Sequence, residues 1–195
     1  MLLFSLLIKY QMEQPVVRYS SVIQLQSVYS GNKLSTTTES DSLEIPSIYC
    51  TRLPFDNGWL WVVDDVVDPI ENSRKPIECG SNITLINPIT KSYVGTKKSH
   101  DGIEVVPTTL GDDPENQWTV ICSKGPNWVK DDEVQLQNVK NSCYLSTSLE
   151  LRQDDLSIKY NVTCSPLSSA SVWKSAEGVY ILEEEEQKET PREEL

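Results

Sequence analysis

The chain has 195 residues, a length typical of a single domain with a hydrophobic core of its own. The hydrophobic fraction of 38% is low, but the charged fraction of 24% is ordinary, so a globular chain remains the expectation. Acidic residues outnumber basic ones by 29 to 17, and the formal net charge of -12 argues against binding to nucleic acid or to an anionic membrane surface.

The first segment, residues 1–15, opens with the mostly apolar run Met1–Ile8 and is expected to be a signal segment. The run is too short to span a bilayer, which takes about 20 residues. No basic residue precedes it and no small-x-small cleavage site follows closely. A buried first strand, or a start codon placed too late, is an alternative explanation of the same run. No membrane span is expected elsewhere in the sequence.

Residues 16–182 are expected to form one domain that is built from three internal repeats. Each repeat contains an apolar-polar-apolar segment, a polar turn and a second short apolar segment, with nine residues between the paired apolar positions. This pattern predicts a β-hairpin in each repeat. The paired positions are Leu25 and Leu34, Leu85 and Val94, and Leu136 and Leu145. The repeats are expected at about residues 16–64, 77–124 and 128–176.

Each repeat ends on a strand that begins with tryptophan. Trp61, Trp118 and Trp173 lie 36, 33 and 37 residues after the first leucine of their repeats. A longer irregular stretch is expected between the hairpin and this last strand. One such unit cannot bury its own apolar face, but three units around an axis close a small barrel without exposed sheet edges. The sequence therefore predicts an all-β protein, a β-trefoil, in which the tryptophans are buried anchors between repeats.

The C-terminal residues 183–195 are expected to form an acidic, solvated tail, because seven Glu stand there against two basic residues. Its last four residues are similar to the Lys-Asp-Glu-Leu tetrapeptide that retrieves proteins to the endoplasmic reticulum. They are Arg192, Glu193, Glu194 and Leu195. Together with the apolar N-terminus, this ending predicts location in the lumen of the endoplasmic reticulum.

Two further features bear on that compartment. Asn82 and Asn161 each begin an Asn-x-Thr sequon and are candidate sites of N-glycosylation. Five cysteines, at positions 50, 79, 122, 143 and 164, lie outside any Cys-x-x-Cys or zinc-like cluster. In an oxidising lumen, two disulfides and one free thiol are the natural count. The sequence alone leaves the connectivity of these cysteines open.

Side chains that carry catalysis or metal binding are sparse. The one histidine, His100, lies between Ser99 and Asp101, but adjacency in sequence is not the geometry of a catalytic triad, and a loop position is expected for it. The spacing of the cysteines and His100 does not match a zinc site, and the acidic run Asp131–Glu133 does not match a calcium loop. No carboxylate pair is singled out for glycoside hydrolysis. We expect no catalytic residue, no metal site and no cofactor.

Several segments resemble parts of MIR motifs. They are Ile77–Leu85, Tyr93–Ser99, Gln117–Cys122, Asn127–Val134 and Trp173–Tyr180. Taken together they resemble the stromal-cell-derived-factor-2 family of lumenal proteins, from about Val16 to Tyr180. The resemblance implies a β-trefoil of three MIR motifs and an accessory role in lumenal protein quality control. It implies as partners a lumenal J-domain co-chaperone, through it a BiP-type chaperone, and misfolded client proteins, with no catalytic residue.

The cysteine pairing follows from this resemblance alone. By analogy with the family, Cys79 pairs with Cys122 and Cys143 with Cys164, which leaves Cys50 free. The chain departs from the family in its first repeat, where Tyr19 and Ser20 replace the usual Cys-Gly opening. The span 62–78 also lacks a cysteine that the family has there.

Two classes of function are compatible with these features. An adaptor or co-chaperone module predicts buried tryptophans and one asymmetric binding patch. A glycan-binding module of the trefoil lectin type predicts exposed aromatic side chains with polar neighbours in equivalent pockets of the three repeats. MIR motifs also occur as lumenal inserts in protein O-mannosyltransferases, but such an enzyme needs a multi-spanning membrane body that this sequence does not contain.

Overall fold

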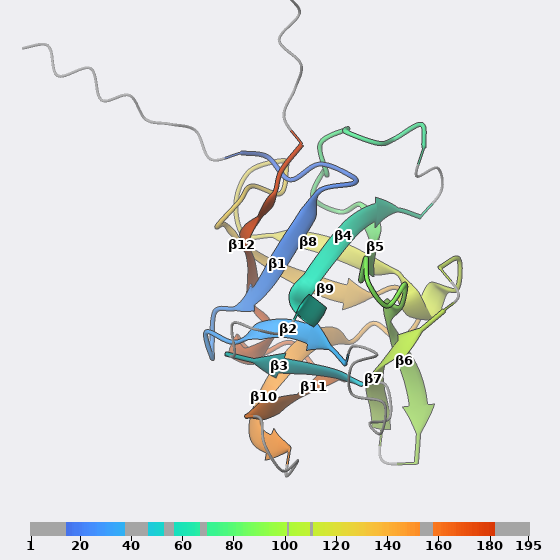
Figure 1. Ribbon diagram of the computed structural model, residues 1–195, viewed down its shortest axis with the longest axis vertical. Helices are drawn as coiled ribbons and strands as arrows, with labels where there is room; N and C mark the ends of the chain where they lie inside the picture. Colours follow the sequence, from blue (N-terminus) through green and yellow to red (C-terminus); the bar gives the residue numbers. More distant parts are fainter. Residues whose placement is uncertain are drawn as a thin grey trace, which may run out of the picture.

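The computed structural model of the protein describes residues 15–37, 47–52, 57–66, 70–100, 102–109, 111–152 and 158–181. These residues form a 12-stranded antiparallel sheet and three short 3-10 helices (Figure 1). The fold is all-β, and its three repeats of four strands form the β-trefoil that the sequence predicts.

Each repeat contributes the same elements in the same order. The first contains β1 (Val22–Ser27), β2 (Lys33–Thr36), β3 (Ile48–Thr51), the 3-10 helix η1 (Asn57–Trp59) and β4 (Leu60–Asp65). The second contains β5 (Asn82–Ile86), β6 (Tyr93–Ser99), β7 (Gly102–Thr108), η2 (Pro114–Asn116) and β8 (Trp118–Cys122). The third contains β9 (Glu133–Asn138), β10 (Tyr144–Arg152), β11 (Lys159–Ser165), η3 (Ser169–Ser171) and β12 (Trp173–Val179). The stretches expected to be irregular therefore contain the third strand of each repeat.

The first and last strands of the repeats form the barrel wall. β4 pairs with β5, β8 with β9 and β12 with β1, so each repeat is joined to the next and the third is joined to the first. Leu25, Leu85 and Leu136 point into this barrel and are 0% exposed. Ile23, Ile83 and Val134 of the same strands are at most 1% exposed, so each first strand buries two apolar side chains in the core.

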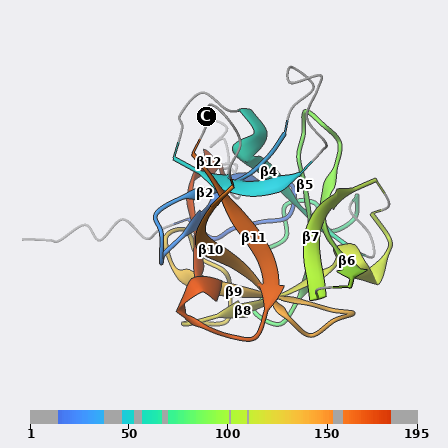
Figure 2. The same cartoon turned by 90° about the horizontal axis from the view of Figure 1, so that it is seen from below.

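The remaining strands form three hairpins at one end of the barrel, which Figure 2 views from below. β2 pairs with β3, β6 with β7 and β10 with β11. The third hairpin lies between the other two, because β11 also pairs with β3 and with β7. The three repeats therefore contact one another at the hairpins as well as along the barrel wall.

The opposite end of the barrel is closed by a ring of three backbone hydrogen bonds, one from each repeat. The Val17 amide donates to the Trp128 carbonyl at 2.8 Å, Trp128 to Ile77 at 2.9 Å, and Ile77 to Val17 at 3.0 Å. All three residues are 0% exposed. The Pro15 carbonyl accepts a hydrogen bond from the Lys130 amide, so the last residue of the expected signal segment contacts the folded domain.

Candidate interaction surface

The three repeat tryptophans have one common environment. Trp61, Trp118 and Trp173 are 0% exposed. Their indole Nε1 groups donate to the carbonyls of Leu34, Val94 and Leu145 at 3.0, 2.7 and 2.8 Å. Each of these hydrogen bonds lies within one repeat, while the backbone next to the tryptophan pairs with the following repeat. The tryptophans are therefore structural, and none of the three offers a ring to a ligand.

The other aromatic side chains do not form a repeated exposed set in the described residues. Trp128 is 0% exposed, and the half-buried Trp59 has the Lys33 ammonium 4.3 Å from its ring centroid. Tyr29, in the turn after β1, is 49% exposed. The equivalent turns after β5 and β9 carry Ile89 and Lys140 instead. A lectin with one aromatic platform in each repeat does not fit this surface.

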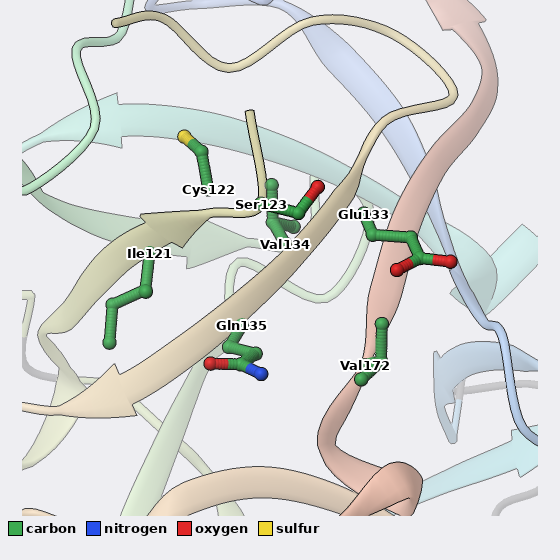
Figure 3. Close-up of a pocket in the computed structure, with 7 residues that line it drawn as sticks. All are labelled: Ile121, Cys122, Ser123, Glu133, Val134, Gln135 and Val172. Atoms are coloured by element: carbon green, nitrogen blue, oxygen red, sulfur yellow. The ribbon is translucent and has the colours of Figure 1, made fainter. Parts of the chain in front are cut away.

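A surface pocket of about 160 Å³ lies where the second and third repeats meet. Figure 3 shows Ile121 of β8 and Gln135 of β9 side by side, with Val172 just before β12 on the far side of Gln135. The full lining is Ile121, Cys122, Ser123, Glu133, Val134, Gln135 and Val172. The volume is below the ~300–1,000 Å³ of most small-molecule sites, so the pocket suits a side chain of a partner protein.

The pocket adjoins an exposed apolar turn of the first repeat. The Val28 amide donates to the Val172 carbonyl at 2.9 Å, and Val28 and Tyr29 are 43% and 49% exposed. We call Val28, Tyr29, Ile121 and Val172 the junction patch. These residues come from all three repeats, and together they combine an aromatic ring with aliphatic side chains of the kind found at the centre of protein interfaces.

The junction patch is not repeated with threefold symmetry. Between the second and third repeats, Gln117 and Lys140 take the places of Val172 and Tyr29, and Lys140 forms an ion pair with Glu115 at 3.0 Å. Between the first and second repeats, Leu60 and Ile89 stand there, an aliphatic pair without an aromatic ring. A binding surface at the junction patch is therefore asymmetric.

The structure contains two disulfides, Cys79–Cys122 and Cys143–Cys164, with Cα–Cα distances of 5.6 and 5.3 Å. They are the same two pairs that the family resemblance implies. Cys50 is free and 0% exposed, and burial raises the pKa of its thiol to about 12. A thiol of this kind stays protonated at neutral pH and is not a reactive site. Two disulfides are typical of proteins from oxidising compartments.

The remaining candidate residues are dispersed. Asn82 is exposed at the start of β5, Asn161 is half-buried within β11, and His100 lies in the exposed turn between β6 and β7. Residues 1–14 and 182–195, with most of the expected signal segment and Arg192–Leu195, lie outside the described residues.

Within the described residues, no group of three or more His, Cys, Asp or Glu side chains is placed to hold a metal ion. The same part of the chain contains no helix of the length and apolar character needed to cross a membrane.

No family model matches the chain, so the expected number of MIR motifs stays a prediction. A curated relative, stromal cell-derived factor 2-like protein 1 of Mus musculus, is 29% identical over 115 residues, which are 54% of this chain and 51% of the relative. The chain thus matches about half the length of that protein. The crystal structure of the SDF2-like protein from Arabidopsis thaliana superposes with a TM-score of 0.73 at 21% identity, covering 85% of this chain and 97% of that one.

The chain is therefore similar to SDF2-like proteins, in sequence over about half its length and in fold over most of it. A second solved structure, the Saccharomyces cerevisiae protein O-mannosyltransferase Pmt1–Pmt2 complex bound to the sugar donor, also shares the fold of this chain. It superposes with a TM-score of 0.72 at 15% identity and covers 92% of this chain but 28% of that chain. The trefoil therefore corresponds to one part of a much larger protein in that complex.

Proposed function

We propose that this chain is an SDF2-like protein and a non-catalytic accessory of protein folding and quality control in the lumen of the endoplasmic reticulum. It binds a J-domain co-chaperone, and through it a BiP-type chaperone that acts on misfolded clients. The observation that carries the proposal is the agreement of two comparisons on one family, by sequence with the mouse protein and by fold with the plant protein.

The surface favours a protein partner over a glycan. The repeat tryptophans are buried, and the aromatic ring of Tyr29 has no aromatic equivalent in the other two repeats. Ile121 and Val172 of the junction patch line the pocket, and Val28 and Tyr29 adjoin it through the backbone hydrogen bond from Val28 to Val172. In many protein interfaces a few central side chains, tyrosine prominent among them, supply most of the binding energy. We therefore place partner binding at the junction patch.

The test is cross-linked affinity purification of the full-length protein from a secretory-pathway extract, followed by mass spectrometry. The wild type is expected to recover a J-domain co-chaperone and BiP. The double variant Val28→Ser, Tyr29→Ser is expected to recover about tenfold less of both, because a loss of about 1.4 kcal/mol is tenfold in affinity. Both residues are partly exposed, so the substitutions leave the core intact.

The matched control is Ile89→Ser at the threefold-equivalent turn position, where Ile89 is 51% exposed. This variant is expected to recover the chaperones as the wild type does. An equal loss in both variants would move the binding site away from the junction patch. Recovery of glycoproteins that free sugar releases, without the chaperones, would replace the adaptor role with a glycan-binding one.

Lumenal location is tested through the C-terminal tetrapeptide. Deletion of Arg192–Leu195 is expected to turn a retained protein into a secreted one, because the retrieval receptor binds these residues with their free carboxylate. The measurement is the ratio of protein in medium and cells. Replacement of the four acids Glu183–Glu186 by Gln, which leaves the tetrapeptide in place, is the control and should keep the protein inside. Unchanged retention after the deletion would rule out the tail as the retention signal.

A further inference from the structure

The two sequons stand in different structural surroundings. Asn82 is the first residue of β5 and is exposed, whereas Asn161 lies in the middle of β11 and is half-buried. We infer that the folded protein carries an N-linked oligosaccharide on Asn82 and none on Asn161. This inference rests on the lumenal location proposed above.

The Asn82 side chain is oriented for such a linkage. Its Oδ1 accepts a hydrogen bond from the Thr119 hydroxyl of β8 at 2.7 Å. In the transfer from a lipid-pyrophosphate-linked oligosaccharide, the bond between sugar C1 and the pyrophosphate oxygen breaks, a C1–Nδ2 bond forms and Nδ2 loses one proton. Oδ1 takes no part in the new bond. The Thr119 hydrogen bond is therefore retained after modification, and the sugar extends from Nδ2 at an exposed strand end.

Asn161 is enclosed by strands of other repeats. It lies opposite Tyr49 of β3, while Lys159 lies opposite Thr51, and Thr163 of the same sequon lies opposite Glu104 of β7. Side chains directly opposite each other in a sheet lie on the same face, as do those two residues apart along one strand. The face that carries Asn161 is thus the face of Tyr49, Thr51 and Lys159.

On the β3 side of Asn161 that face is closely packed, whereas Glu104 on the β7 side is exposed. Tyr49, Thr51 and Lys159 are 4%, 1% and 5% exposed. The Lys159 ammonium lies 4.8 Å from the centroid of the Tyr49 ring, so the two side chains pack together beside Asn161. An oligosaccharide on the half-buried Asn161 would lie directly beside this packed pair. We therefore expect a glycan at Asn161 to disturb the contact of Lys159 with Tyr49 and with it the pairing of β11 and β3.

The enzyme that transfers the oligosaccharide acts on the chain before it folds. Whether a modified chain then reaches the folded state depends on which Asn carries the glycan. Chains that are modified at Asn82 fold as unmodified chains do. Chains that are modified at Asn161 cannot form the β3–β11 contact and are expected in the insoluble fraction. The relevant measurement is therefore glycan occupancy in the soluble, folded population.

The experiment expresses the full chain behind an added, independently proven export signal in eukaryotic cells. Release of the glycan by an amidase in heavy-oxygen water converts each occupied Asn to a labelled Asp, which mass spectrometry locates. Soluble wild type is expected to carry the label at Asn82 and less than a tenth as much at Asn161. Soluble Asn82→Gln should show no shift in gel mobility on release, and soluble Asn161→Gln should shift as the wild type does.

Label at Asn161 in soluble protein, or no label at Asn82, would overturn the inference. Site mapping on the wild type needs no variant to fold, so a misfolded Asn161→Gln leaves the result intact. The unaltered chain is measured in parallel. If only the chain with the added signal is modified at Asn82, the sequon inference stands and the proposed lumenal location fails.

Discussion

Replacement of Trp118 by Ala is expected to lower the free energy of unfolding by about 3–5 kcal/mol, the range found for truncation of large aromatic residues in protein cores. Trp118 is 0% exposed and packs inside the barrel. The substitution removes this contact area and also leaves the Val94 carbonyl without its indole donor. Since domains are commonly stable by about 5–15 kcal/mol, the loss is a large share of the total. Urea denaturation of the oxidised protein, followed by circular dichroism, measures it.

The hydrogen bond is separated from the packing by comparing two Trp→Phe variants. Trp118 donates to Val94 at 2.7 Å, whereas the Nε1 of Trp128, which is also 0% exposed, has no hydrogen-bond partner among the described residues. Trp118→Phe leaves a buried carbonyl without its donor, but Trp128→Phe removes a buried N–H that bonds to no described group of the protein. We expect Trp118→Phe to cost about 1–3 kcal/mol more than Trp128→Phe. An equal cost, or a greater one for Trp128, would contradict this assignment of the indole hydrogen bonds.

The repeats are visible in the sequence because their core residues recur at fixed spacing. Alternation around Leu25, Leu85 and Leu136 predicts the strands β1, β5 and β9, and the tryptophans mark β4, β8 and β12. These strands turn apolar side chains toward the core and polar side chains such as Gln24, Thr84 and Gln135 to the other face, so their residues alternate. The family resemblance adds the disulfide pairs, which spacing alone leaves open.

The third strands could not be predicted in the same way. β3 (Ile48–Thr51) is four residues long and buried throughout, so its sequence shows no alternation. β7 (Gly102–Thr108) contains Gly102 at its start and Pro107 within it, two residues that disfavour strands. Pairing with β11, which is distant in the sequence, supports both of these strands. Local patterns do not contain such long-range contacts.

Turn geometry is likewise set by the trefoil more than by residue type. Ser20, Gly80 and Asp131 are equivalent positions in the three repeats and have φ values of 67°, 97° and 65°. Only the second repeat uses glycine, the residue that adopts this conformation without steric cost. In each repeat the amide donates to the strand that ends it, to Val63, Val120 or Ser175. This bond fixes the turn even where Ser or Asp stands.

The junction patch was not found from the sequence because its members are far apart in the chain. Val28, Ile121 and Val172 belong to three different repeats, and each is an ordinary aliphatic residue in its own segment. A comparison of equivalent positions contains a usable signal. Tyr29 stands where the other repeats have Ile89 and Lys140, and Val172 stands where they have Leu60 and Gln117. A departure from internal symmetry at exposed positions indicates a surface that only one junction uses.

Removal of the Cys79–Cys122 disulfide is expected to lower the free energy of unfolding by about 4 kcal/mol, and removal of Cys143–Cys164 by about 3 kcal/mol. The bridges join residues 43 and 21 positions apart. A bridge across a longer segment excludes more conformations of the unfolded chain, so its loss stabilises the unfolded state more. The variants are Cys79→Ser with Cys122→Ser and Cys143→Ala with Cys164→Ala, measured by urea denaturation under oxidising conditions.

Cys50 provides the matched control, because Cys50→Ala removes a cysteine without opening a loop. Its side chain is 0% exposed and hydrogen-bonds with Thr147, so this variant loses local packing and that bond but opens no loop. Burial raises the pKa of the Cys50 thiol to about 12, so the folded protein has almost no thiolate there to exchange with either disulfide at neutral pH. The order of the two decreases in the free energy of unfolding therefore reflects the lengths of the loops that the disulfides close. A greater loss for the shorter loop would show that native packing around Cys143 and Cys164, and not the unfolded chain, determines the stabilisation.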